Sequence, residues 1–271
     1  MAVQAKAEAN NSTRIDVLIP AIDKDLNTLP HVIDSVRRHV RHPIGRIYIV
    51  SPESSGIRKL CSRKNCTFVN ERTVLPFTKD DIHYQSSRWN RSGWLYQQLL
   101  KMNGDRVVKA QHFLVIDADT VLIRPHSFMT GNKTAFYCRD WSQPEYFNTY
   151  RKLLRSKAPR PRSFVTHYML FEKTELASLK KKIETIHRLP WYKAILSSIN
   201  KKKQFGFSEY ETYANYMYSS HAERMILRSS KNKSLSKDAS SLSNQEIRTL
   251  SRRYRSLSFH KRKIYSKAPR A

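Results

Sequence analysis

The chain has 271 residues, 39% of them hydrophobic, which is enough for one large α/β domain with a substantial buried core. Lysine and arginine number 50 against 22 acidic residues, and the formal net charge is +28. This charge favours a negatively charged partner such as nucleic acid, an anionic membrane surface or a phosphorylated substrate. The longest apolar runs have the length of strands, far below the ~20 residues of a membrane-spanning helix, so the composition excludes an integral membrane protein.

Cysteine usage and the N-terminal residues favour a cytoplasmic location. Three cysteines cannot all form disulfides, and no second Cys or His pair completes a zinc site with Cys61 and Cys66. Residues 1–13 form a polar tail without the apolar core of a secretory signal. We therefore expect a cytoplasmic protein, with peripheral contact at the inner face of the membrane as an additional hypothesis.

In the first half of the chain, strand-like segments alternate with helix-like ones. The spacing predicts a helix that begins at Pro30 and a second helix, Gly93 to Met102, capped by Ser92. Strands are predicted over residues 15–19, 47–50, 67–69 and 113–116. This alternation is typical of a three-layer α/β/α sandwich around a mostly parallel, twisted sheet.

The second half is less regular. Strands are predicted over 134–138 and 164–171, and helices are predicted to begin at Thr174 and Ser208. From Arg228 onward there are thirteen basic residues against two acids, which predicts either a tail or an ordered strap on the main body. The expected organisation is a catalytic-size domain over 14–227 followed by a basic Ser/Lys/Arg-rich segment over 228–271.

An acidic motif follows the most apolar of the predicted strands. Asp117-Ala118-Asp119 comes directly after Phe113 to Ile116. In open α/β sheets, ligands bind at the carboxyl ends of the strands. Mg²⁺ and Mn²⁺ prefer oxygen ligands and often bind through one or two carboxylates together with substrate phosphates. The sequence therefore predicts a divalent metal site here.

Three interpretations of the motif are open. An aspartate at a strand end can simply hydrogen-bond its own turn. The sequence Asp117 to Leu122 also resembles the nucleophile motif of haloacid-dehalogenase-like phosphatases, although later carboxylates that would complete such a magnesium site are missing. The third interpretation is glycosyl transfer, in which a cation neutralises the charge that develops on a departing nucleoside diphosphate.

The order of the motifs favours the third interpretation. The segment Ile15 to Asp25, the DxD motif and a late acidic helix start together resemble the GT-A nucleotide-diphospho-sugar transferases. Over about residues 14 to 225 the chain resembles a bacterial family of largely uncharacterised glycosyltransferases within that superfamily. The phrases that carry this resemblance are Arg91-Ser92-Gly93-Trp94 with Gln97-Gln98-Leu99-Leu100-Lys101, Phe164-Val165-Thr166-His167-Tyr168-Met169 and Ser208-Glu209-Tyr210-Glu211-Thr212-Tyr213.

The resemblance implies a metal-dependent transferase in envelope polysaccharide or glycan synthesis, with a nucleotide-diphosphate sugar as donor and a saccharide or lipid-linked acceptor. It implies that Asp119 binds Mn²⁺ or Mg²⁺ directly, while Asp117 contacts the ribose or the metal through water. A histidine from late in the chain often completes the metal site, and the candidates are His260 and His167. The implied donor-binding residues are Pro20, Ala21, Ile22, Asp23, Arg91, Asp117 and Ala118.

The catalytic and acceptor-binding candidates lie in the second half. In inverting relatives an acid at a late helix start deprotonates the acceptor, which indicates Glu209 first and Glu211 second. Ser208 and Glu211 have capping-box spacing, so we expect Glu209 to be the freer carboxylate. His167 and Trp141 are candidates for the acceptor site. Ordinary structural roles remain open for each: an interior histidine, a core aromatic ring, or a carboxylate near a helix dipole.

A nucleic-acid-binding protein is the non-enzymatic alternative, because it would explain the charge directly. The sequence contains no helix-turn-helix, zinc-finger or aromatic-basic sheet signature, and no specific nucleic acid is expected as a partner. The basic residues could instead draw the protein to anionic lipid, at about 1 kcal/mol for each residue near the surface. Equal binding to anionic vesicles with and without residues 228–271 would contradict this hypothesis.

Overall fold

The central element of the fold is a five-stranded sheet in the order β10-β6-β1-β2-β3. The computed structural model describes residues 13–159 and 161–259. β1 pairs in parallel with β2 and β6, β3 pairs in parallel with β2, and β10 runs antiparallel to β6. The predicted, mostly parallel sheet is confirmed. Its strands are β1 (Ile15–Pro20), β2 (Ile44–Ser51), β3 (Thr67–Asn70), β6 (His112–Ile116) and β10 (Tyr168–Glu172).

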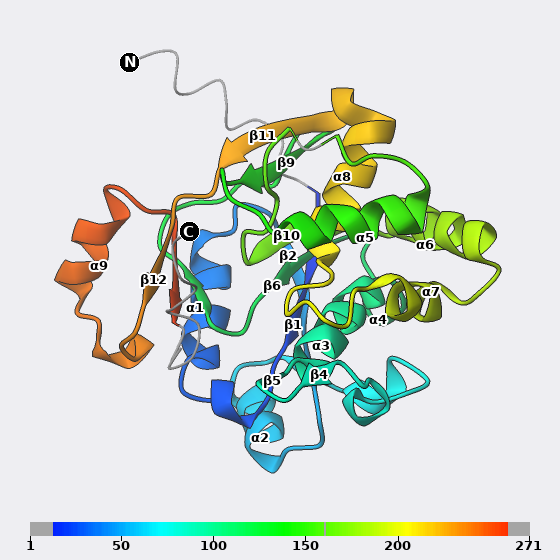
Figure 1. The fold of residues 1–271 in the computed structure, drawn as a ribbon. Helices are drawn as coiled ribbons and strands as arrows, with labels where there is room; N and C mark the ends of the chain where they lie inside the picture. The colour runs from blue at the N-terminus through cyan, green and yellow to red at the C-terminus, as the bar shows by residue number, and fades with distance from the viewer. Residues whose placement is uncertain (1–12, 160, 260–271) are drawn as a thin grey trace.

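Helices cover both faces of this sheet (Figure 1). Alternate side chains of β1 point to opposite faces: Val17 and Ile19 pack with α1 and α2, whereas Leu18 joins the core under α3 and α5–α8. A strand buried on both faces explains the continuous apolar run in the sequence. The helices are α1 (Leu29–His39), α2 (Ser55–Arg63), α3 (Ser92–Met102), α4 (Gly104–Val107), α5 (Pro144–Leu154), α6 (Lys173–His187), α7 (Trp191–Ser198), α8 (Glu209–His221) and α9 (Asn244–Ser251).

Two local predictions were wrong. Ser92 is the first residue of α3, not its cap, and its hydroxyl accepts from the Tyr84 N–H at 3.1 Å. The strand predicted over 164–171 begins only at Tyr168, because residues before it form a loop. In addition, α5 was not predicted from the sequence, although it buries Tyr146, Tyr150 and Leu153 at helical spacing.

Two smaller sheets extend the fold beyond the central sheet. The order of one sheet is β11-β9-β8 and that of the other is β12-β13-β7. The bounds are β7 (Thr120–Leu122), β8 (Met129–Thr130), β9 (Lys133–Cys138), β11 (Met225–Ser229), β12 (Asn232–Leu235) and β13 (Ser256–Phe259), with a separate hairpin of β4 (Gln85–Ser86) and β5 (Trp89–Asn90). Short 3₁₀ turns are η2 (Asp23–Asp25), η3 (Glu71–Thr73), η4 (Lys79–Asp81), η5 (Ala222–Arg224) and η6 (Ala239–Ser241).

Residues 228–259, called the strap below, are ordered on the main body. Its last strand, β13, pairs antiparallel with β7, which follows the acidic motif. Leu257 and Phe259 pack with Ile123 in a small apolar cluster of their own. Of the two alternatives for this segment, the described part is therefore the strap, seen in orange to red at the left of Figure 1. The boundary expected between residues 227 and 228 falls inside β11.

Candidate metal and donor site

The acidic motif lies at the carboxyl end of β6, as predicted. Asp117 follows the last residue of the strand, its N–H donates to the His167 carbonyl at 2.9 Å, and its own carbonyl closes a turn by accepting from Thr120 at 3.1 Å. The antiparallel register pairs Ile116 with Tyr168, so the residue after β6 lies beside the residue before β10. Pairing of these two strands thus brings His167 to the motif across 50 positions of sequence.

Asp117, Asp119 and His167 form a cluster whose potential ligand atoms all lie within 4.8 Å of one another. Around one ion with bonds of about 2.1 Å, ligand atoms are roughly 3 to 4 Å apart, so these three fit a single divalent cation. Two carboxylates and an imidazole suit Mn²⁺, Mg²⁺ or another borderline divalent metal. The residues present therefore fit the expected cofactor.

The two aspartates have different surroundings. Asp117 Oδ1 lies 2.5 Å from the Lys101 ammonium, and its Oδ2 lies 3.1 Å from His167 Nδ1. An ionised carboxylate only accepts hydrogen bonds, so His167 Nδ1 is the donor in this contact. A carboxylate that fixes the tautomer of a metal-binding histidine is a common arrangement behind metal ligands. Asp117 thus holds the imidazole, and all three residues could contribute to one metal site.

Lys101, to which the sequence analysis assigned no role, is the centre of a buried ionic network. Its ammonium also lies 2.8 Å from Glu209 Oε1, and its side chain is only 4% exposed. Burial alone would lower the pKa of Lys101, but Asp117 and Glu209 raise it well above its usual value. Burial alone would raise the pKa of Asp117, yet Lys101 and His167 outweigh burial and hold it well below its usual range. Both groups therefore carry full charge at neutral pH.

Glu209 is not the free carboxylate that the capping pattern predicted. It is 2% exposed and paired with Lys101, and burial raises its pKa although Lys101 opposes the shift. Ser208 does cap α8, accepting from the Glu211 N–H at 3.2 Å. A general base must lie within hydrogen-bonding reach of the proton it removes, and in this conformation the Glu209 carboxylate is held by Lys101.

Glu211 is also buried, at 1% exposure, and its side chain does not complete the capping box. Its carboxylate accepts from Ser142 at 2.6 Å and from Ser163 at 2.7 Å, and Asn215 donates to it at 3.1 Å. Burial raises the pKa of Glu211, and the two serine hydroxyls oppose that shift. The carboxylate thus ties together the loop that carries Trp141 and the loop that leads to His167.

The loop after β1 lies at the same edge of the sheet as the acids, because β1 and β6 are parallel neighbours. Ala21 is buried, whereas Ile22 is 42% exposed and Asp23 accepts a hydrogen bond from Ser54. Asp25 was not among the predicted site residues. Its carboxylate accepts from the Ile22 N–H at 2.9 Å, and burial raises its pKa, with smaller contributions in the same direction from Asp119 and Asp117.

The other predicted residues are placed as follows. Ala118 is 3% exposed and packs in the core on the α1 side. Arg91 is buried between Trp94 and Phe205, with its guanidinium carbon 4.6 Å from each ring centroid. Trp141 is 57% exposed. His260 lies outside the described residues.

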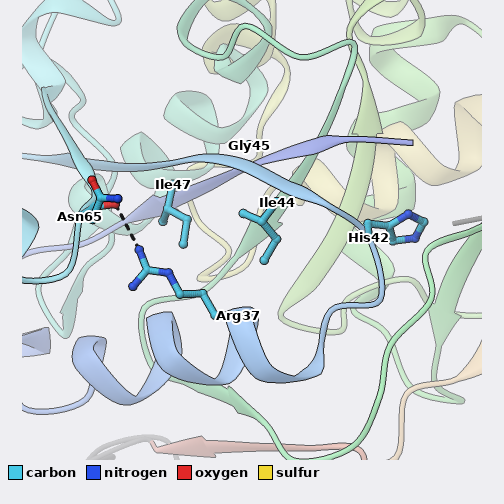
Figure 2. A pocket seen from close by; sticks show the side chains of 6 residues that line it. All are labelled: Arg37, His42, Ile44, Gly45, Ile47 and Asn65. Carbon is cyan, nitrogen blue, oxygen red and sulfur yellow. Dashed lines mark hydrogen bonds between the residues drawn. The ribbon is translucent and has the colours of Figure 1, made fainter. Parts of the chain in front are cut away.

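A pocket at the opposite edge of the sheet is separate from this site. It has a volume of about 350 Å³ and lies near the amino end of β2. Arg37 extends across it and donates to the Asn65 carbonyl at 3.1 Å, which braces α1 against the end of α2 (Figure 2). Its arginine holds backbone carbonyls, and none of the described residues that line it is an acid, so this pocket is not the predicted site.

The comparisons with known proteins bear on the family and the fold. A protein-family model matches residues 5–249. The chain belongs to this family, DUF6492, a family of unknown function. No curated protein matches the sequence. In the described part of the chain, no helix is long and apolar enough to cross a membrane.

The structural relatives found are glycosyltransferases at low sequence identity. A crystal structure of an active-site mutant of LgtC aligns with a TM-score of 0.50 at 12% identity, over 90% of this chain and 87% of that chain. The galactosyltransferase LgtC in complex with donor and acceptor sugar analogs gives 0.49 at 13% identity and the same coverage. The bifunctional WbbM gives 0.49 at 13%, with 96% of this chain covering 47% of WbbM, about half its length. The fold is thus an α/β fold that resembles the GT-A fold of LgtC.

Proposed function

We propose that this protein is a metal-dependent glycosyltransferase that moves a sugar from a nucleotide diphosphate to a saccharide or lipid-linked acceptor. The observation that carries the proposal is the cluster of Asp117, Asp119 and His167, within 4.8 Å of one another at the carboxyl end of β6. A metal cluster at this edge of the sheet is where a nucleotide ligand of an open α/β fold is bound.

In the proposed reaction an acceptor hydroxyl forms a bond to the anomeric carbon of the donor sugar. The bond between that carbon and the diphosphate oxygen breaks, its electrons leave with the nucleoside diphosphate, and the hydroxyl proton is released to solvent. A bound divalent cation supplies charge neutralisation to the departing diphosphate.

The chain's own residues position the parts of this reaction. Asp119 and His167 would hold the cation, and Asp117 orients the imidazole. Lys101 keeps Asp117 ionised and fixed from the interior. In this proposal the exposed loop at Ile22 and Asp23 contacts the nucleoside, and Trp141 and Arg91 remain candidates for the acceptor and the diphosphate. Glu209 and Glu211 act in this proposal as positioning residues, because both are buried.

The phosphatase alternative is weaker on two counts. The cluster found among the described residues contains two carboxylates and a histidine, with no later carboxylate pair. In addition, a nucleophilic aspartate needs an oxygen that can reach phosphorus, whereas both oxygens of Asp117 are engaged by Lys101 and His167.

The test is calorimetric titration of the full chain with a panel of nucleotide-diphosphate sugars, with and without Mn²⁺. We expect one sugar nucleotide to bind only when Mn²⁺ is present, and Asp119→Asn to lose that binding. The exposed Asp80→Asn, whose partner is Lys79, is the matched control and should bind as the wild type does. Metal-independent binding of every nucleotide sugar, or Mn²⁺-dependent release of phosphate from simple esters, would overturn the proposal.

A further inference from the structure

A second pocket, of about 320 Å³, adjoins the acid cluster, because His167 belongs to the cluster and also lines this pocket. One wall is the end of β9, with Arg139 and Asp140, and another is the loop of Thr166 and His167. The strap closes the third side with residues 229–232. We call this space the strap pocket. It is polar on all three sides, so it suits a hydrophilic ligand.

The walls of the strap pocket are fixed by hydrogen bonds. The Ser230 N–H donates to the Cys138 carbonyl at 2.9 Å, and the backbones of Arg139 and Ser163 exchange two bonds of 2.9 Å. The side chain of Asn232 is held by Ser256 and Ser258 at 2.8 and 2.9 Å. The pocket is therefore a preformed feature of the strap and the main body together.

Backbone strain is concentrated in this pocket. Five described non-glycine residues have positive φ, and three of them, Asn65, Arg155 and Arg188, end or directly follow helices, where that conformation is ordinary. The other two are His167 at φ 72° and Lys231 at φ 43°, and both line the strap pocket. A left-handed conformation costs a residue with a Cβ roughly 1–2 kcal/mol, and such strain clusters at ligand-binding sites.

The residues that line the strap pocket carry more positive than negative charge. Arg139 and Lys231 line it, together with Asp140, whose carboxylate is paired at 2.7 Å with Arg162 from outside the lining. Arg139 also lies over Trp141, with its guanidinium carbon 4.8 Å from the ring centroid. Outside the lining, the Glu211 carboxylate accepts hydrogen bonds from the hydroxyls of Ser142 and Ser163. The His167 ring contacts the Asp117 carboxylate. The lining thus carries two cations and one carboxylate that a further arginine already neutralises, and this balance favours an anion.

We infer that the strap pocket receives an anionic saccharide, whose carboxylate or phosphate lies near Lys231 and Arg139 and whose hydroxyl reaches the acid cluster past His167. This inference rests on the proposed function, in which that saccharide is the acceptor. The donor diphosphate, its metal ion and the two aspartates together do not provide excess positive charge. An acidic acceptor therefore needs basic residues from another part of the protein. The strap supplies it through Lys231.

The test is to measure the binding of matched glycosides to the full chain, followed by NMR as each glycoside is titrated in the presence of Mg²⁺. The probes are 4-nitrophenyl β-D-glucuronide, the 6-phosphate of 4-nitrophenyl β-D-glucoside, and the neutral glucoside. We expect at least one acidic glycoside to bind about tenfold more tightly than the neutral one, since a charge-assisted hydrogen bond is worth about that factor. The stronger of the two identifies carboxylate or phosphate as the recognised group.

Variants separate a charge effect from misfolding. Lys231→Gln should remove most of the preference, and Lys231→Gly should remove it too while relieving the left-handed backbone, so its thermal midpoint should not fall. The exposed Lys237→Gln, whose ammonium pairs with Glu246 at 2.6 Å outside the pocket, is the control and should keep the preference. Equal binding of all three glycosides, or a preference that survives both Lys231 variants, overturns the inference.

These outcomes differ from those of the donor titration. Loss of Mn²⁺-dependent nucleotide-sugar binding would contradict the proposed transferase while leaving the glycoside preference intact. Conversely, Mn²⁺-dependent donor binding with no preference among glycosides would keep the transferase and refute the anionic acceptor.

Discussion

The ammonium of Lys101 lies 2.5 Å from Oδ1 of Asp117, so a buried cation on α3 holds the first acid of the motif. The ammonium lies within the same contact range of Glu209, at 2.8 Å, which makes one lysine the partner of two carboxylates. Removing one member of a buried ion pair leaves an uncompensated charge, which costs much more than the pair itself contributes. Removing one charged member of this network should therefore lower the free energy of unfolding by a measurable amount.

Lys101→Met should therefore destabilise the protein by about 3–5 kcal/mol, measured by urea unfolding at neutral pH. The double variant Lys101→Met/Glu209→Gln should recover part of that loss, because one of the two stranded charges is neutralised. A Lys101→Met variant within about 0.5 kcal/mol of the wild type would contradict the network. Lys64→Met, which loses a much more exposed pair with Asp34, is the control and should lie within about 1 kcal/mol.

The two acids of the motif should behave differently when each is changed to asparagine. Asp119→Asn should reduce Mn²⁺ affinity at least tenfold with a small change in thermal midpoint. Asp117→Asn should reduce both, because Lys101 and His167 lose their shared partner. Mn²⁺ calorimetry and thermal unfolding of the two variants measure the difference. Equal midpoints for both variants would argue against the ordering of roles proposed for them.

The motif and its strand could be predicted from the sequence because the signal is local. An unbroken apolar run before Asp117 indicates a strand buried on both faces, and two acids at its end indicate a ligand site. His167 could be named but not assigned, because its place beside Asp117 depends on the register of β10 against β6, which no local pattern contains. The histidine was expected at the acceptor site or in the metal site, and the geometry favours the second.

Most features of the site that could not be predicted from the sequence depend on which charged side chains are buried together. Glu211 has capping-box spacing with Ser208 and Glu209 does not, but the partners of the two carboxylates are Ser163 and Lys101, which are distant in sequence. One feature of the sequence does indicate the ionic network. Lys101 falls three residues after Gln98 on the buried side of α3, and a lysine there requires a buried anionic partner.

Stability between pH 6.5 and about 3 should depend on His126, which is fully buried beside Phe128 and Tyr168. Its Nδ1 lies 2.7 Å from the Arg124 carbonyl and its Nε2 lies 3.1 Å from the Tyr168 hydroxyl, so the neutral ring satisfies both partners. Burial lowers its pKa to about 3. In that window the unfolded chain binds the proton and the folded chain does not, so stability falls as pH falls, by roughly 2 kcal/mol from pH 6.5 to pH 5.

Urea unfolding across this pH range gives the measurement. His126→Gln should lower stability at neutral pH and flatten the slope between pH 6.5 and 5, whereas exposed His31→Gln should keep the wild-type slope. If the His126 variant loses stability on acidification as steeply as the wild type does, another group carries the proton linkage.

The strap should contribute to the stability of the whole domain. Leu257 is fully buried and its strand pairs with β7, so Leu257→Ala should cost about 2–5 kcal/mol through lost burial and the cavity left behind. Leu227 on β11 is 38% exposed, and Leu227→Ala should change stability by less than about 1 kcal/mol. The comparison uses the unfolding midpoint in urea. A silent Leu257→Ala would indicate a detached tail instead of an integral strap.

Trp141 should affect saccharide binding without affecting the fold. Its ring is 57% exposed and lies under the Arg139 guanidinium, while Ser142, the next residue, is anchored by Glu211. An aromatic ring fixed in this way can stack on the apolar face of a sugar, and Trp141→Ala should weaken binding of the preferred glycoside by roughly 3- to 10-fold. Trp141→Phe should keep part of the affinity, since it keeps a flat ring. Both variants should unfold at the wild-type midpoint and bind the nucleotide sugar normally. A loss of donor affinity in Trp141→Ala would instead place the ring at the nucleotide.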